Sequence, residues 1–222
     1  MVGVLQYPRH AENRITVIGI DVGGQRKGFH AVTLTDGEFS CRYASSDVDQ
    51  VVNWCRTFGA TKIALDAPCH WSADGRARPA ERQLMEKGIW CFSTPTRQTA
   101  VGHQKNHYGW MLQGEKLFKA LEASHPLCNG FPAKGQKCSM ETFPHAITWH
   151  LNGGNADAKH KRLQRRSLLQ QAGIDLAELT NIDFVDAALC ALTAHYVAIG
   201  YRCVIYGDEC TGHIIVPESL RV

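Results

Sequence analysis

Acidic residues recur at the ends of apolar segments in this 222-residue chain. Asp21 closes one β-branched run and Asp66 closes another, while Asp183 and Asp186 lie three residues apart in a later apolar stretch. Residues at this spacing share one face of a helix. Buried carboxylates are costly without a partner and repel one another, and a bound divalent cation relieves both effects. Their oxygen atoms suit Mg²⁺ or Mn²⁺.

Glu141 extends this acidic set, because it stands where an expected strand meets a helix that begins at Pro144. Each acid also has an ordinary structural interpretation. Asp183 suits the first turn of a helix, where the helix dipole favours negative charge. Asp21 and Asp66 could form turns, and Glu141 could pair with a lysine. The ordered combination is more specific than any one of its members.

The elements that would position these acids follow from the hydrophobic pattern. A nearly continuous apolar run at 14–21 predicts a central strand that is covered on both faces. A second run at 28–35 ends at Asp36-Gly37, a hairpin turn signal, and 39–44 would be the returning strand. The sheet therefore begins with three antiparallel strands.

A helix at 46–58 and a strand at 61–66 would then add a parallel strand to this sheet. The remaining expected elements are helices at 79–87, 108–124, 158–172 and 181–199, a strand at 138–143, and a terminal hairpin formed by 203–206 and 213–216. Residues 69–139 show weak periodicity, and neither helix there would supply a separate core. We expect a single domain over 1–222, with 69–139 as a loop-rich insertion.

Composition favours a globular protein in a reducing compartment. The hydrophobic share is 44%, the charged share is 20% and the net charge is +3, which is compatible with a polyanionic partner. No apolar run approaches the roughly 20 residues of a membrane span, and the start lacks the apolar stretch of a signal peptide. The nine scattered cysteines form no Cys-x-x-Cys pair. We expect free thiols and a cytoplasmic location without membrane attachment; a few disulfides, or a metal site at Cys128, Cys138 and a histidine, are the alternatives.

Four motifs, taken in order, resemble a known family. They are Gly19-Ile-Asp21, Ile63-Ala-Leu-Asp66-Ala-Pro68, Glu141-Thr-Phe-Pro144 and Asp183-Phe-Val-Asp186-Ala-Ala-Leu189. This pattern resembles the predicted RNase H-like nucleases, a prokaryotic group once described only as a domain of unknown function. The wider likeness is to Holliday-junction resolvases in the RNase H superfamily. The resemblance extends over residues 15–200.

The resemblance implies an α/β fold with an RNase H-like mixed sheet, in which three antiparallel strands and further parallel strands are flanked by helices. It also implies metal binding by Asp21, Asp66, Asp183 and Asp186. Glu141 belongs to the group's own pattern and not to the resolvase set. Asp66 stands where resolvases usually have glutamate, so its side chain is shorter. A homodimer is suggested by the resolvase likeness, although no dimer-forming helix is identified.

The expected function is therefore a metal-dependent nuclease that hydrolyses phosphodiester bonds of nucleic acid, either DNA or RNA. Asp21 would bridge two Mg²⁺ or Mn²⁺ ions about 3.5–4 Å apart, and the other acids would complete their shells. The candidate catalytic residues are Asp21, Asp66, Glu141, Asp183 and Asp186.

Basic residues could hold the phosphates of such a substrate. The helix at 158–172 is rich in Lys and Arg, and Arg162 would share a face with Arg165 or Arg166. An ordinary solvated face is the alternative. Tryptophans in the insertion, at 71, 90 and 110, could stack on bases or simply pack in the core. The candidate substrate-binding residues are Arg82, Lys159, Arg162, Arg165 and Arg166.

Two other functions fit parts of the same pattern. Residues 19–24 also resemble the phosphate loop of sugar kinases and actin-like ATPases, which are nucleotide-binding phosphotransferases. Those proteins enclose a nucleotide between two such domains, and this chain has only one loop of that kind. A non-catalytic scaffold that binds nucleic acid is the third hypothesis. Stabilisation by metal would favour the nuclease, and stabilisation by ATP would favour the phosphotransferase. Stabilisation by neither ligand would favour the scaffold.

Overall fold

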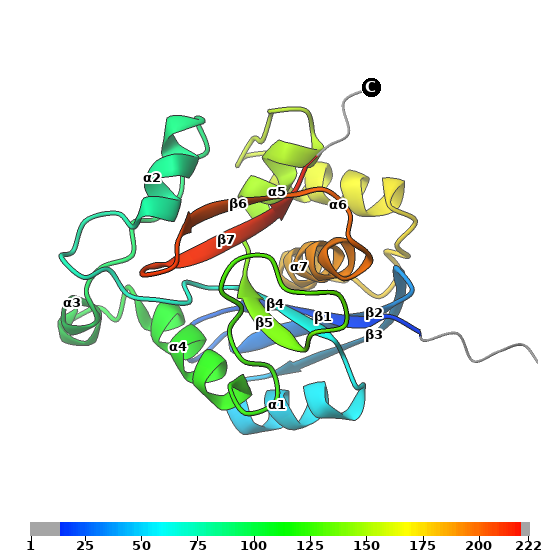
Figure 1. The fold of residues 1–222 in the computed structure, drawn as a ribbon, viewed down its shortest axis with the longest axis horizontal. Helices are drawn as coiled ribbons and strands as arrows, with labels where there is room; N and C mark the ends of the chain where they lie inside the picture. Colours follow the sequence, from blue (N-terminus) through cyan, green and yellow to red (C-terminus); the bar gives the residue numbers. More distant parts are fainter. Residues whose placement is uncertain (1–13, 219–222) are drawn as a thin grey trace, which may run out of the picture.

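A seven-stranded mixed sheet with helices on both faces forms the protein (Figure 1). The structure is a computed structural model that describes residues 14–218. The strands are β1 (Thr16–Val22), β2 (Phe29–Thr35), β3 (Glu38–Ser45), β4 (Lys62–Asp66), β5 (Cys138–Glu141), β6 (Cys203–Asp208) and β7 (Gly212–Pro217). The helices are α1 (Val48–Thr57), α2 (Pro79–Glu86), α3 (Arg97–Gly102), α4 (Gly109–Leu121), α5 (Pro144–Leu151), α6 (Lys161–Gln171) and α7 (Ile182–Ile199).

The strand order is β3-β2-β1-β4-β5-β7-β6. The first three strands pair antiparallel, and β4, β5 and β7 then continue the sheet in the direction of β1. The last strand, β6, pairs antiparallel with β7 as a terminal hairpin. The expected RNase H-like mixed sheet is confirmed, and β7 extends its parallel part beyond the two strands that the resemblance implied.

Helix α7 packs directly on the centre of the sheet because β1 contains Gly19. A Cβ atom at this position would lie only 2.0 Å from the backbone nitrogen of Ala191 and 2.1 Å from the carbonyl oxygen of Ala187. The absence of a side chain therefore permits close contact between strand and helix. The side chain of Asn181 accepts a hydrogen bond from Phe184 at the start of α7, and Gly200 ends it in the left-handed conformation.

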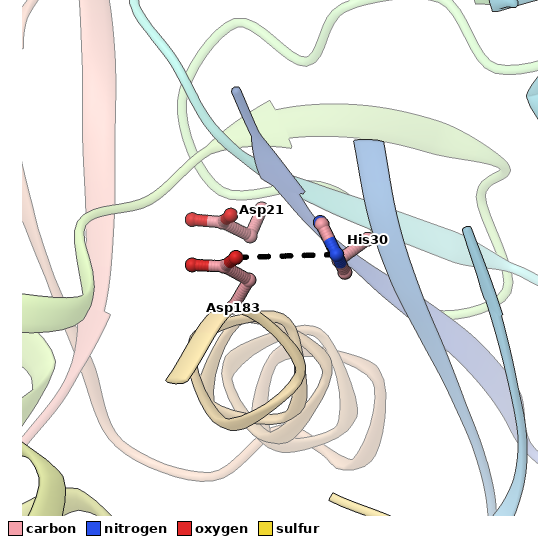
Figure 2. A group of neighbouring side chains, drawn as sticks. All are labelled: Asp21, His30 and Asp183. Carbon is pink, nitrogen blue, oxygen red and sulfur yellow. Dashed lines mark ion pairs between the residues drawn. The ribbon is translucent and has the colours of Figure 1, made fainter. Parts of the chain in front are cut away.

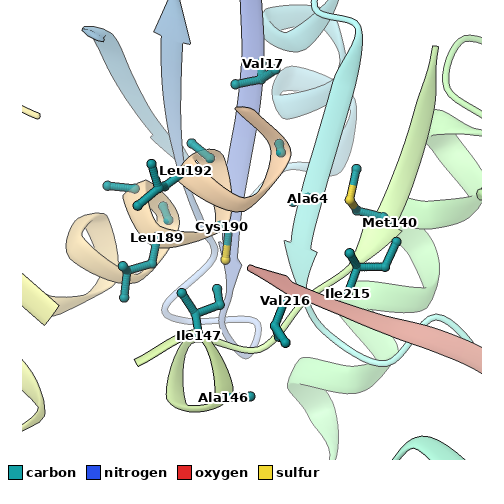
Figure 3. Close-up of a cluster of buried hydrophobic side chains, with 14 of the residues drawn as sticks. Val17, Ala64, Met140, Ala146, Ile147, Leu189, Cys190, Leu192, Ile215 and Val216 are labelled. Atoms are coloured by element: carbon teal, nitrogen blue, oxygen red, sulfur yellow. The ribbon is translucent and has the colours of Figure 1, made fainter. Parts of the chain in front are cut away.

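Two cores lie on opposite faces of the sheet. The larger is built around α7 and includes Val17, Ala64 and Leu189 (Figure 3). The smaller lies under α1 and α4 and includes Ile18, Ile63 and Leu117. Neighbouring residues of one strand thus enter different cores, as the alternation of a strand requires.

Among the described residues, α7 is the one helix long and apolar enough to cross a membrane by length and composition. Inside this protein, however, 72% of its 18 residues are buried. Its place against β1, β2 and β4 makes it the central helix of the larger core.

The segment 69–139 contains α2, α3 and α4, of which the six-residue α3 was not expected from the sequence. Leu84 of α2 joins the core around α7, whereas Leu117 and Leu121 of α4 join the core on the other face. Both helices are therefore anchored in the packing of the main sheet. All nine cysteines lie in the described part of the chain, and none of them forms a disulfide there.

Candidate metal centre

The two strand-end aspartates lie side by side at one edge of the sheet. Asp21 of β1 pairs in register with Asp66, the last residue of the parallel strand β4. Because partners in register point to the same face, both carboxylates project from the sheet together. Asp21 follows Gly19 by two residues, so this face is the one that α7 covers.

The helical aspartates approach this edge from α7. Asp183 lies in the first turn of the helix, and Asp186 follows one turn later and is buried. The guanidinium of Arg165, on α6, donates a hydrogen bond to Asp186 Oδ1 at 2.5 Å. Arg165 is itself buried. Three separate elements therefore bring their acids to the place where β1 and β4 end.

Burial and neighbouring charges both act on the carboxylates of this cluster. Burial raises the pKa of Asp66 well above its ordinary value, and the negative charges of Asp21 and Asp186 raise it further. Burial likewise raises the pKa of Asp186 to about 6, although Arg165 opposes the shift. The pKa of Asp21 is raised by burial, and the charge of Asp183 adds to the shift, against the attraction of Lys27. The cluster holds more negative charge than its surroundings neutralise.

Lys27 lies between two of these carboxylates. Its Nζ atom is 2.9 Å from Asp21 Oδ2 and 2.8 Å from Asp183 Oδ1. The lysine side chain is 44% exposed and belongs to the turn between β1 and β2. The ammonium group of Lys27 thus occupies the position in which a metal cation would bridge Asp21 and Asp183. Because the lysine side chain is partly exposed, it can turn towards solvent when a metal ion binds.

His30 completes a group that sequence reasoning did not identify. Ligand atoms of Asp21, His30 and Asp183 all lie within 4.8 Å of one another (Figure 2). The Nε2 atom of His30 is 3.9 Å from Asp183 Oδ2, and burial lowers the pKa of the imidazole. His30 is the antiparallel partner of Asp21. Pairing the two expected strands across their turn could have placed it there.

These residues fit a hard divalent cation. Asp21, Asp183 and His30 offer ligand atoms close enough for one ion, and the oxygens of Asp66 and Asp186 lie outside this group. Carboxylate oxygens predominate in the whole cluster, as Mg²⁺ and Mn²⁺ prefer. Asp66 makes no ion pair with any residue of the described chain, although it has two acidic neighbours. A carboxylate left in this state is stabilised by a cation.

Glu141 occupies a different environment from the four aspartates. It ends β5 and pairs in register with Leu65, not with Asp66. Both of its oxygens accept hydrogen bonds from Arg78, at 2.6 and 2.9 Å, and Oε2 also accepts from the backbone amide of Cys69 at 2.8 Å. The ion-pair interpretation of this acid therefore holds, with a buried arginine in the place of the lysine considered from the sequence.

The basic candidates are not gathered on one surface. Arg165 points inward to Asp186, whereas Arg162 on the same helix is exposed. Arg166 donates a hydrogen bond to the carbonyl of Leu179, which satisfies it locally. Lys159 is exposed just before α6, and Arg82 is exposed on α2, where it donates to the carbonyl of Ala77. The expected shared face of Arg162 and Arg165 is thus divided between solvent and the acidic cluster.

The strand order and the flanking helices define an α/β fold with an RNase H-like mixed sheet. The chain matches the family model described as "Protein of unknown function (DUF429)" over residues 19–211, and it belongs to that family. A search of solved structures finds similarity to T. thermophilus RuvC in complex with a Holliday junction substrate. The sequence identity is 14%, the TM-score is 0.44, and the match covers 84% of this chain and 96% of that one. No curated protein matches this sequence significantly.

Proposed function

We propose that this protein is a metal-dependent nuclease that hydrolyses phosphodiester bonds of DNA or RNA. The observation that carries the proposal is the convergence of four aspartates from β1, β4 and α7 at the carboxyl ends of two neighbouring strands, with ligand atoms of Asp21, Asp183 and His30 within 4.8 Å of one another. In this proposal Asp21, Asp66, Asp183 and Asp186 hold Mg²⁺ or Mn²⁺. Such ions activate a water molecule and stabilise the leaving oxygen of a phosphodiester.

The protein's own groups would prepare the site in three ways. The register of β1 and β4 fixes Asp21 beside Asp66. Arg165 donates a hydrogen bond to the carboxylate of Asp186, which restricts the rotation of that side chain. His30, whose pKa is lowered by burial, presents a neutral imidazole beside Asp183.

Metal-dependent cleavage and stabilisation test this function together. Labelled single-stranded DNA, duplex DNA, RNA and a four-way junction are incubated with the protein in Mg²⁺, Mn²⁺ or EDTA. We expect cleavage of at least one substrate with metal and none in EDTA. At 100 times its dissociation constant, the metal should stabilise the fold by about 2.7 kcal/mol. This raises the melting temperature by roughly 5–10 °C for a protein of this size.

The contrary results are also specific. Absence of both cleavage and metal stabilisation would remove the support for a nuclease. Stabilisation by ATP, without cleavage of any polymer, would favour the phosphotransferase that residues 19–24 resemble.

Lys27 gives a prediction about metal affinity that needs no substrate. Its ammonium contacts one oxygen of Asp21 and one of Asp183, so a metal ion that binds these oxygens competes with it. In Lys27→Met this competition is absent, and we expect Mn²⁺ to bind roughly tenfold more tightly, which corresponds to about 1.4 kcal/mol. Isothermal titration calorimetry measures the change directly.

Arg26→Met is the matched control. Arg26 is exposed on the same turn and makes no ion pair with any residue in the described ranges, so its replacement removes one positive charge without freeing a carboxylate. Equal affinity gains in both variants would mean that general charge, and not competition at the site, controls binding.

A further inference from the structure

Positive charge and exposed aromatic rings are concentrated in the segment 69–139. It carries ten Lys or Arg residues against five Asp or Glu, which leaves more acids than bases in the rest of the chain. It also presents Trp90 and Phe92, whose exposed fractions are 76% and 67%. Two large apolar side chains exposed two residues apart in the chain indicate a binding surface more often than a structural one.

These two rings, called here the aromatic platform, stand on a well-anchored segment between α2 and α3. Ile89 on one side of them is fully buried, and its amide bonds to the carbonyl of Leu84. On the other side, Thr94 is buried, and both its amide and its hydroxyl donate hydrogen bonds to Glu81. The exposure of the rings therefore reflects the local fold and not a frayed loop.

One ring of the aromatic platform, that of Phe92, lies beside a member of the acidic cluster. Phe92 lines a pocket together with Asp66, and the rings of Trp110 and Phe143 form further walls of the same pocket. A polymer held against these rings would pass one of the proposed metal ligands.

We propose that the aromatic platform stacks against unpaired bases, so that the substrate has a single-stranded region beside the bond that is cut. This proposal rests on the nuclease function and names its substrate class. Aromatic rings stack on any base face, and exposed basic side chains of the same segment, such as Arg82 and Lys87, can neutralise phosphates. In a duplex each base face is covered by the adjacent base pair. A base can therefore stack on Trp90 or Phe92 only after it has left the double helix.

Oligonucleotide binding measured without metal, so that no cleavage occurs, tests the aromatic platform independently of catalysis. Fluorescence anisotropy would measure the affinity of the protein in EDTA for a labelled single-stranded oligonucleotide and for a duplex of the same sequence. We expect Trp90→Ala and Phe92→Ala each to weaken single-strand binding about tenfold and to leave duplex binding within about twofold. Trp90→Phe should recover most of the affinity, because a flat ring is retained.

Phe131→Ala is the matched control. Phe131 belongs to the same segment and is 57% exposed, but it lies beside Val197, which is 14 residues and roughly 20 Å along α7 from Asp183. We expect this variant to bind single strands like the wild type. Circular dichroism would verify that all three alanine variants remain folded.

Three results would overturn the proposal. They are unchanged single-strand affinity in the Trp90 and Phe92 variants, equal losses for single strand and duplex, and an equal loss in Phe131→Ala. Analytical ultracentrifugation adds a fourth, because a wild-type dimer that Trp90→Ala dissociates would show that the rings serve an interface between copies. Intact platform-dependent binding without cleavage in metal would instead refute the nuclease function alone.

Discussion

Replacement of Asp21 by asparagine should reduce metal-dependent cleavage by roughly a thousandfold, or about 4 kcal/mol of transition-state stabilisation. Asp21 is in register with Asp66 on one side and with His30 on the other, so it occupies the centre of the cluster. Asparagine keeps the shape of the side chain and removes the charge on which a bridging ligand depends. Initial cleavage rates in Mn²⁺ measure the loss.

The fold should survive this change. Burial already raises the pKa of Asp21, which means that its surroundings disfavour the charged form. The ion pair with Lys27 is partly exposed, so its loss should cost little stability. Asp186→Asn is a less informative variant, because it would leave the buried guanidinium of Arg165 without its carboxylate partner.

Asp49→Asn provides the comparison for Asp21→Asn. Asp49 is an exposed acid in the first turn of α1, the helix that covers the opposite face of the sheet. Its replacement should leave the cleavage rate within twofold of wild type. If Asp21→Asn retained a tenth of the activity while folded, the carboxylate cluster would not be the centre of the chemistry.

The parts of the fold that were predictable from the sequence are those set by local pattern. The apolar run of β1 and the long apolar helix α7 were both expected within about two residues of their actual bounds. The turn signal at Asp36-Gly37 correctly indicated an antiparallel pair. Short α3 was missed because six residues carry too little periodicity to separate a helix from a loop.

The candidate site was predictable only in its acids. The structure gathers Asp21, Asp66, Asp183 and Asp186, while their catalytic and metal-binding roles remain proposals. His30 was missed because the two expected strands were not paired residue by residue across their turn, and Lys27 because its contacts depend on the conformation of that turn. The inward direction of Arg165 depends on how α6 packs on α7. The spacing of residues along one helix predicts which of them share a face, but it does not predict which neighbouring element that face contacts.

The pairing of Glu141 illustrates the same limit at longer range. Its partner Arg78 lies 63 residues earlier in the chain, at the start of α2. The pairing positions α2 and joins the segment 69–139 to the end of β5. The acidic pattern alone does not show that Glu141 pairs with a buried arginine, and the catalytic role of Glu141 stays a prediction.

Arg78→Met should destabilise the protein by about 3–5 kcal/mol, because it removes one partner from a buried ionic network. The guanidinium bonds to Glu81 through Nε and to Glu141 through Nη1 and Nη2. All three side chains are at most 5% exposed. Without Arg78, two buried carboxylates lose their only ionic partner in the described chain. Urea unfolding followed by circular dichroism measures the difference.

Arg76→Met is the control for this variant. Arg76 is 86% exposed, and its one ion pair in the described chain is a long contact of 3.8 Å with the exposed Asp74. Its replacement should change the unfolding free energy by less than about 0.5 kcal/mol. Arg78→Lys should lie between the two extremes, because lysine keeps the charge but lacks the planar fork that binds a carboxylate through two nitrogens.

A double variant separates the buried charge from the loss of packing. In Arg78→Met, changing Glu141 to glutamine removes one uncompensated carboxylate, so Arg78→Met/Glu141→Gln should be more stable than Arg78→Met alone by about 1–2 kcal/mol. Glu141→Gln in the wild-type background should instead destabilise, because it removes a charge that Arg78 requires. If Glu141→Gln destabilised both backgrounds equally, the ion pair would contribute nothing specific, and the position of α2 would depend on its apolar contacts.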